Sequence, residues 1–136
     1  MIKEAKLRKE LVVAMPNKVG ILADMSKIMA DHGINIEGAC GYAANNEAKI
    51  MLVVDDVLRG KEALQKGGYK AIKENEVIDI VLENKPGALK VLTAKLAKDN
   101  IDIKYTYGSV CAGGCPARII VATTDNEKAL VSLKAK

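Results

Sequence analysis

Short runs rich in β-branched residues alternate along the chain with longer segments whose apolar residues fall at helical spacing. Runs of the first kind are typical of strands, and apolar residues three or four positions apart are typical of helices packed on a core. Residues 19–32 have this spacing at Ile21, Leu22, Met25, Ile28 and Met29, and residues 86–99 have it at Leu89, Leu92 and Leu96. The pattern predicts strands at 10–15, 34–43, 48–54, 69–76, 77–83, 101–110 and 117–123, and helices at 19–32, 58–67, 86–99 and 126–134.

The same order of elements occurs twice, in register at a shift of 67 residues. At this shift residues 17–36 lie over residues 84–103 without a gap, and seven of the 20 positions are identical. The identical pairs are Asn17/Asn84, Lys18/Lys85, Gly20/Gly87, Leu22/Leu89, Ala30/Ala97, Ile34/Ile101 and Ile36/Ile103. A match of this length indicates a tandem duplication. It predicts a first domain at 9–76 and a second domain at 77–136.

Turn residues punctuate both copies at matching places. The first helix of each copy is followed by Gly33 or Asn100, the two residue types that tolerate the left-handed conformation after a helix end. Asn45-Asn46 and Gly113-Gly114 are predicted to join neighbouring strands as hairpins. In the second copy Ile101, Ile103, Tyr105 and Tyr107 alternate, so we expect all four to face the helices.

Strand–helix–strand, hairpin, then helix–strand is the ferredoxin-like βαββαβ plan. It predicts an α+β fold in which each unit has an antiparallel sheet with two helices on one face. The second unit ends after its second helix and so lacks its last strand, which leaves the strand at 77–83 as an exposed edge. Residues 2–9, the strand at 69–76 or a second chain could fill that place, and the sequence does not choose among them.

Composition and charge limit the classes of function that the chain could have. The chain is 49% hydrophobic but has no Trp, no Phe and four Tyr, so its cores must be aliphatic. The net charge of +4 comes from 21 basic and 17 acidic residues that are mixed along the chain, which does not favour a nucleic-acid groove. No apolar run is long enough to span a bilayer, and the N-terminus MIKEAKLRKE lacks the apolar stretch of a signal peptide. We therefore expect a cytoplasmic protein with reduced cysteines.

An Asn-Lys-x-Gly turn between a strand and a helix occurs in both copies. The segments read PNKVGILADM at 16–25 and ENKPGALKVL at 83–92, and each helix leads through GI or NI into the next strand. This pattern, in two copies in register from about Lys9 to Leu133, resembles the ACT domain, a regulatory module of enzymes such as aspartate kinase. The resemblance implies binding of an amino acid or similar small metabolite. It also implies that two domains join their sheets side by side, with effector sites at the seam.

The resemblance assigns ligand contacts to the strand–helix loop and to the start of the second strand. Carried over by position, the contacts are Asn17, Gly20, Ile21 and Asn35 in the first unit, and Asn84, Gly87, Ala88 and Asp102 in the second. A helix N-terminus suits a carboxylate, glycine lets a ligand approach the backbone, and an Asn amide offers both a donor and an acceptor. Asp102 stands where family members often carry Asn, which predicts two sites of unequal preference. Met15 and Leu82 stand where serine-binding members tend to have a polar residue, which favours a ligand with an apolar side chain.

Two alternatives remain open. Asn is a common helix cap and Pro86 suits a first helical turn, so each loop could be no more than a helix start. Cys111 and Cys115 flank a three-residue hairpin loop and could supply half of a tetrahedral zinc site or a redox pair. Neither His32 nor Cys40 completes that site, so two reduced thiols are the default and four ligands would need a homodimer.

The remaining motifs give no indication of catalysis. The chain has no Walker loop, no nucleophile elbow and a single His, so we expect neither an enzyme nor a cofactor. The sequence predicts a tandem amino-acid sensor that binds neither nucleic acid nor membrane. We expect it to form a homodimer, with a metabolic enzyme as a candidate regulated partner.

Overall fold

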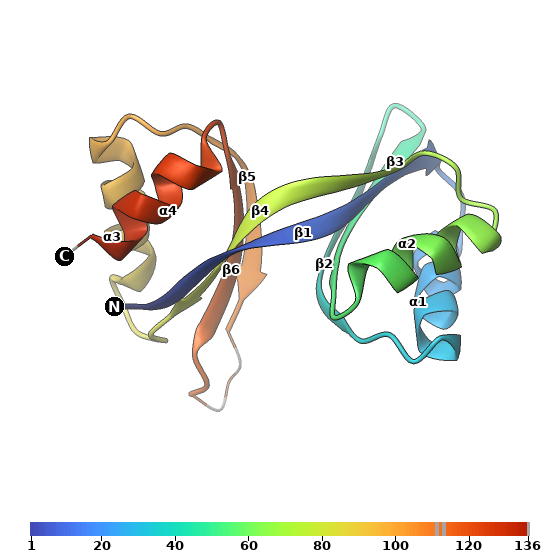
Figure 1. The fold of residues 1–136 in the computed structure, drawn as a ribbon, viewed down its shortest axis with the longest axis horizontal. Helices are drawn as coiled ribbons and strands as arrows, with labels where there is room; N and C mark the ends of the chain where they lie inside the picture. Colours follow the sequence, from blue (N-terminus) through green and yellow to red (C-terminus); the bar gives the residue numbers. More distant parts are fainter. Residues whose placement is uncertain (111, 113, 136) are drawn as a thin grey trace. The chain divides into compact units, whose positions relative to one another are not determined.

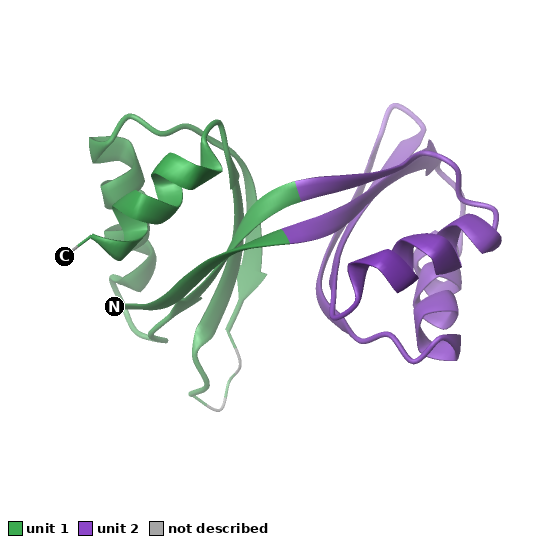
Figure 2. Ribbon diagram, viewed as in Figure 1, with its two compact units in different colours: residues 1–8, 76–136 green, residues 9–75 purple. Residues whose placement is uncertain are grey.

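Two compact units make up the computed structural model, which describes residues 1–110, 112 and 114–135 (Figure 2). One unit comprises residues 9–75, and we call it the continuous unit. The other comprises residues 1–8 together with residues 76–136, and we call it the composite unit because two separate stretches of chain form it. Each unit has its own hydrophobic core.

The continuous unit has the ferredoxin-like plan (Figure 1). Its strands lie in the order β2-β3-β1-β4, with β1 and β4 each contributing one of their halves. The elements are β1 (Ile2–Pro16), α1 (Ile21–Asp31), β2 (Ile36–Ala44), β3 (Glu47–Val54), α2 (Val57–Lys66) and β4 (Ile72–Leu82).

The composite unit repeats this plan with the strand order β1-β4-β6-β5. Its further elements are α3 (Ala88–Lys98), β5 (Ile103–Ser109), β6 (Ala117–Thr123) and α4 (Asn126–Lys134). The first half of β1, residues 2–8, supplies the last strand, so the place left vacant by the sequence pattern is filled by the start of the chain. The N–H of Ala14 donates to the carbonyl of Ala71 (3.2 Å) and that of Glu83 to the carbonyl of Met1 (2.9 Å). Strands β1 and β4 are therefore antiparallel.

One continuous strand replaces the two predicted at 69–76 and 77–83. Strand β4 runs from Ile72 to Leu82 without a break, so the predicted break between two strands at residues 76 and 77 is wrong. The reason is local: no Gly or Pro interrupts residues 71–83, so nothing ends the extended conformation. The division between the two units falls inside this strand, between Asn75 and Glu76.

The predicted helical faces are the buried ones. Helix α1 buries Ile21, Met25 and Met29, and α3 buries Ala88, Leu92 and Leu96. In the continuous unit these side chains meet strand residues such as Leu11, Val13 and Leu52, and in the composite unit they meet Ile78, Ile80 and Leu82. Each fully buried aliphatic side chain contributes roughly 1.5–3 kcal/mol, so the cores stabilise both units without any Phe or Trp.

Both first helices end in the same hydrogen-bonded motif. Gly33 and Asn100 have positive φ values of 67° and 57°, which confirms the predicted left-handed residues. The N–H of Ile34 donates to the carbonyl of Met29, and the N–H of Ile101 to that of Leu96, each at 2.9 Å. This is the Schellman arrangement, in which the residue after the left-handed one returns to the core. Ile34 and Ile101 are indeed buried in their respective cores.

A β-bulge changes which face of β5 carries the tyrosines. The pairing of β5 with β6 shifts between Ile103 and Tyr105, which places Tyr105 opposite Ala122 and Tyr107 opposite Ile120. Ile101 and Ile103 pack in the helix-covered core as expected, but the expectation for Tyr105 and Tyr107 is wrong. They lie on the sheet face away from the helices, with their rings stacked at a centroid distance of 6.5 Å. An extra residue in one strand reverses the alternation beyond it.

The remaining turns and caps follow from local chemistry. Asn45 and Asn46 have φ values of 53° and 65°, which confirms the predicted two-residue hairpin. Asp56 and Asp125 cap α2 and α4 by accepting from the backbone N–H three residues later. Gly113 of the other predicted turn lies outside the described residues. Among the described helices, none is both long and apolar enough to cross a membrane.

Candidate ligand site

The two Asn-Lys-x-Gly loops have the same backbone shape. Gly20 and Gly87 have φ values of 92° and 90° and are the N-cap residues of α1 and α3. Only glycine adopts this conformation without strain, so the backbone explains why both copies keep it. Among the described residues, no side chain caps either helix. The interpretation of Asn17 and Asn84 as helix caps is therefore wrong, because each lies three residues before the N-cap.

In the continuous unit the loop is joined to the β2–β3 hairpin. The N–H of Asn17 donates to the carbonyl of Asn46 at 2.8 Å. Beside this hydrogen bond lies an open hollow of about 390 Å³, whose lining residues are Ala14, Met15, Pro16, Asn45, Asn46 and Glu47. Asn45 and Asn46 were predicted only as turn formers. Their place beside the loop is a new observation, and no signal in the sequence indicates it, because it depends on the antiparallel register that brings the hairpin next to the end of β1.

In the composite unit the matching loop lies beside the first residue of the chain. A Cβ placed on Gly87 would lie 3.8 Å from the Cε atom of Met1. The Glu83 carboxylate is 2.7 Å from the Lys85 ammonium group, and the hydrogen bond and charge of that lysine lower the pKa of Glu83. The two loops thus have the same backbone conformation but different neighbouring residues.

The first turns of the two helices also differ in charge. Helix α1 carries Asp24, whose carboxylate accepts a 2.5 Å hydrogen bond from the hydroxyl of Tyr69. Burial and this hydrogen bond raise the pKa of Tyr69 to about 12. Helix α3 has Val91 at the matching position and no acidic residue in its first turn. The N-terminus of α3 is therefore the more favourable of the two for an anion.

Ile21 and Ala88 belong to the cores rather than to the surface. Each has 4% of its surface exposed and packs with the strands of its own unit. Of these two predicted site residues, Ile21 can offer a ligand only its backbone N–H group, and the N–H of Ala88 already donates to the carbonyl of Lys85 at 3.3 Å. Asn17, Gly20, Asn84 and Gly87 are exposed.

Asn35 and Asp102 lie at the far end of the sheet from the loop of their own unit. Ile36 pairs with Val54, whereas Ala44 pairs with Glu47 beside the loop, so the length of β2 separates Asn35 from Asn17. Nine residues of strand span roughly 26 Å. Asn35 is held by the side chain of Asp55, and the carbonyl of Asp102 accepts from Thr124. Neither unit by itself brings all four of its predicted site residues together.

The metal-binding form of the cysteine alternative gains no support from the described residues. Cys111 lies outside them, and Cys40 is a free, half-buried thiol in β2. Cys115 is disulfide-bonded, so the expectation of reduced thiols is wrong for this residue. That expectation rested on an inferred compartment and not on the positions of side chains. Within the part of the chain that the structure describes, no three metal-ligating side chains gather.

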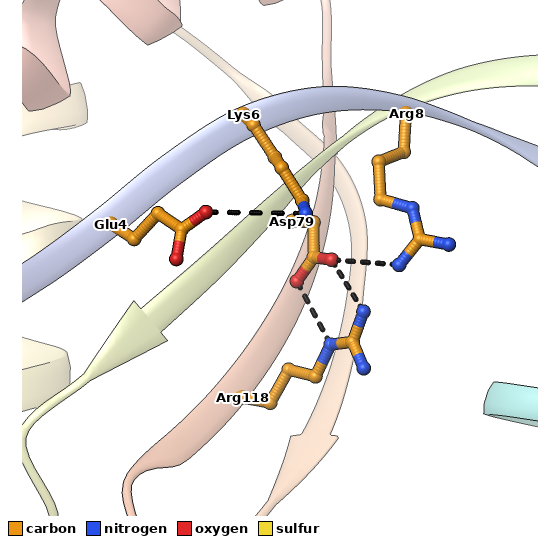
Figure 3. A network of polar contacts seen from close by, with 5 residues as sticks. All are labelled: Glu4, Lys6, Arg8, Asp79 and Arg118. Atoms are coloured by element: carbon orange, nitrogen blue, oxygen red, sulfur yellow. Dashed lines mark hydrogen bonds and ion pairs between the residues drawn. The ribbon is translucent and has the colours of Figure 1, made fainter. Parts of the chain in front are cut away.

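A buried ion cluster in the composite unit has no counterpart in the sequence prediction (Figure 3). Asp79 is 3% exposed and accepts hydrogen bonds from Arg118 Nε at 2.9 Å, from Arg118 Nη2 at 2.5 Å and from Arg8 Nη1 at 3.0 Å. Burial alone would raise the pKa of Asp79, but the hydrogen bonds and charges of the two arginines outweigh it and lower that pKa. Val12 occupies the matching position in the continuous unit, so the cluster belongs to one unit only.

Comparison with known proteins finds a family match over part of the chain. Residues 9–66 match the model of the ACT domain. A search of the curated proteins found no match.

Several solved structures share the fold across both units. A protein from Bacteroides thetaiotaomicron superposes with a TM-score of 0.87 at 23% identity, covering 96% of this chain and 88% of that one. The ligand-free regulatory subunit of aspartate kinase from Thermus thermophilus superposes with a TM-score of 0.68 at 16% identity, covering 97% and 95%. Aspartokinase III of E. coli, in complex with lysine and aspartate, gives a TM-score of 0.50 at 18% identity, covering 97% and 32%. At these identities the likeness establishes the fold.

Proposed function

We propose that the chain is a regulatory protein of the ACT family that binds an amino acid, since residues 9–66 match the model of the ACT domain. The ACT domain is a regulatory ligand-binding module, and the Thermus structure of similar fold is a regulatory subunit. The E. coli structure of similar fold holds two amino acids, which supports this ligand class. We propose further that residues 77–136, completed by the first strand, form a second ACT domain that acts by binding and not by catalysis.

The observation that carries the proposal is the left-handed glycine at the start of both α1 and α3. With glycine at the N-cap and no capping side chain among the described residues, first-turn N–H groups could donate to a carboxylate, except that of Ala88, which donates to the carbonyl of Lys85 at 3.3 Å. In the continuous unit, Asn45 lines the hollow and Asn17 follows its lining residue Pro16 in the chain, so we propose that their amide oxygens accept from the ammonium group of the ligand. An α-amino acid presents this pair of opposite charges.

The separation within each unit supports a site shared between domains. Because Asn35 and Asp102 lie a strand length from the loop of their own unit, contact with both parts requires two ACT domains side by side. A second copy of the chain is one source of such a domain, which is our reason for expecting a homodimer. Asp102 would attract an ammonium group more strongly than Asn35 does, so the two kinds of site would differ in affinity.

The side chain of the ligand is proposed to be apolar. Leu22 and its repeat Leu89 are exposed in the first turns of α1 and α3, next to the two loops. Val19 is exposed within the first loop itself, and Met15 lines the hollow. These side chains offer apolar contacts to the side chain of a ligand. None of them could form a hydrogen bond with a hydroxyl group on that ligand.

Calorimetric titration of the whole chain with each proteinogenic amino acid tests the proposal. Gly20→Ala and Gly33→Ala form a matched pair, because both residues have positive φ and nothing lies within 4 Å of a Cβ at either position. Both variants should therefore be strained to a similar degree. We expect Gly20→Ala to weaken binding at least about tenfold, since it forces the loop away from its shape, and Gly33→Ala to keep the affinity.

Removing the amides gives an independent check. Asn17→Ala and Asn84→Ala should each abolish binding at one class of site and lower the measured stoichiometry. If no amino acid binds, or if Gly20→Ala and Gly33→Ala behave alike, the proposed site is wrong.

A further inference from the structure

Residues 2–6 of β1 have a free edge in the composite unit. On one side they are hydrogen-bonded to β4, but β3 pairs with β1 only from Leu11 onward. In the described chain no strand is paired with the other side of residues 2–6. A strand edge of this kind exposes alternating N–H donors and C=O acceptors, which can accept a further strand.

A hollow of about 510 Å³ lies between this strand and the last turn of α4. Its apolar lining includes Ala5 and Leu133, both of which belong to the core of the composite unit. Three exposed lysines, Lys3, Lys6 and Lys134, also line it. The one acidic residue there, Glu4, lies 3.9 Å from Lys6. The hollow is therefore apolar in part and has a net positive charge.

The charge of the whole chain is concentrated in the same unit. Residues 1–8 and 76–136 contain twelve Lys and Arg against eight Asp and Glu, whereas residues 9–75 contain nine of each kind. The net charge of +4 thus belongs entirely to the composite unit. A field of one sign over a surface attracts a partner of the opposite sign and raises its rate of association.

We propose that the edge of residues 2–6 and the adjoining hollow bind an extended acidic segment of a partner protein, which pairs with β1 as an added strand. The backbone of the segment completes the hydrogen bonds of the edge, its carboxylates lie near Lys3, Lys6 and Lys134, and an apolar side chain covers Ala5 and Leu133. A peptide fits better than a nucleic acid because the edge offers donors and acceptors in alternation, and phosphate groups only accept. The site is distinct from the amino-acid loops, so it stands whether or not they bind a ligand.

The probe is a fluorescent eight-residue peptide of Glu with one Val near its centre, so that carboxylates lie on both faces of the added strand, titrated with the full chain and followed by anisotropy. We expect saturable binding that weakens as salt is added. A second peptide of the same sequence, N-methylated at alternate residues, keeps every charge but cannot form the strand hydrogen bonds, and it should bind at least about tenfold more weakly.

Matched lysine variants locate the site. Lys3→Gln combined with Lys134→Gln should raise the Kd for the peptide roughly two- to tenfold, the range expected for exposed charge contacts. Lys66→Gln combined with Lys70→Gln removes two exposed charges from the continuous unit and should leave the Kd unchanged. Bound peptide should also slow amide hydrogen exchange of residues 2–6.

Several results would overturn the proposal. The N-methylated peptide could bind as tightly as the unmethylated one, or the two pairs of lysine substitutions could change the Kd equally. Bound peptide could also slow amide exchange at a strand edge other than residues 2–6. Tighter binding of a single-stranded oligonucleotide than of the peptide would indicate a polyanion site instead. Self-association that protects residues 2–6 without any peptide would assign the edge to a second copy of the chain.

Discussion

Asp79 is the residue on which the charged groups of the composite unit converge. It lies on β4 between Arg8 of β1 and Arg118 of β6, and its carboxylate is almost completely buried. A buried carboxylate is stable in its charged form only because two guanidinium groups hydrogen-bond to it. Removing it would leave both cations without their shared counter-ion.

We therefore expect Asp79→Asn to lower the free energy of unfolding by about 3–5 kcal/mol, as is typical when one partner of a buried ion cluster is removed. Urea denaturation monitored by circular dichroism measures the change. The control is Asp102→Asn, an exposed residue, which should change stability by no more than about 0.5 kcal/mol. Equal effects of the two substitutions would show that Asp79 contributes no special stability.

The same residue predicts a dependence on pH. Because its pKa is lowered in the folded state from an ordinary value of 3.8, Asp79 stabilises the fold at any pH above that value. The stabilisation is lost as the pH falls from about 3.8 through the lower folded pKa. Thermal unfolding between pH 7 and pH 2 should show a steep acid loss in the parent chain. The loss should be shallower in Asp79→Asn, and identical slopes would contradict the assignment.

At the scale of elements, hydrophobic spacing located most of the fold. Strand β6 and helix α4 have the predicted bounds, because a β-branched run and an Asp cap mark them clearly. The pattern could not locate the first half of β1, since residues 2–9 carry charges at the positions that face solvent. It also could not show the bulge in β5, because one extra residue leaves the composition of a strand unchanged.

The candidate site was predictable only in part. The repeated Asn-Lys-x-Gly pattern located both loops, and the left-handed glycines support that reading. The pattern gave no sign that the β2–β3 turn lies against the first loop, because that proximity depends on strand register. The distance between Asn35 and Asn17 also depends on the register and length of the strands, which the repeated pattern does not show.

The Schellman motif that ends α3 allows a test at one residue, Asn100. Asn100 holds a left-handed conformation at φ 57°, where Ala would be strained by roughly 1–2 kcal/mol and Gly would not. We expect Asn100→Ala to destabilise the chain by about 1 kcal/mol and Asn100→Gly to match or exceed the parent in stability. Chemical denaturation of the three proteins measures the order. If Ala and Gly prove equivalent, the backbone conformation at this position does not limit stability.

For the whole molecule, the main observation is that the composite unit joins both ends of the chain. Residues 1–8 and 76–136 form it, and the 67 residues between them form a unit of their own. Ala5, near the start of the chain, is buried in one core with Leu92 and Leu133. A defect at residue 5 should therefore be felt by elements that follow it by more than 70 residues.

We expect Ala5→Asp, which introduces a charge into that core, to destabilise the composite unit by about 2 kcal/mol or more. Hydrogen exchange resolved by mass spectrometry should then show faster exchange in residues 76–135, while residues 17–66 keep their protection. Lys3→Asp, an exposed change on the same strand, is the control and should leave both regions protected. Uniform loss of protection across the chain would mean that the two units unfold together.

The divided composite unit also has a consequence for how the protein is made. Residues 2–8 leave the ribosome well before their partner strand, which ends at residue 82. At synthesis rates of about 5–20 residues per second, the first strand waits roughly 4–15 seconds for that partner. During this interval the continuous unit can be completed, and the waiting strand is an unpaired edge exposed to other nascent chains. The charges of Lys3, Lys6 and Arg8 then help to keep it soluble until its partner arrives.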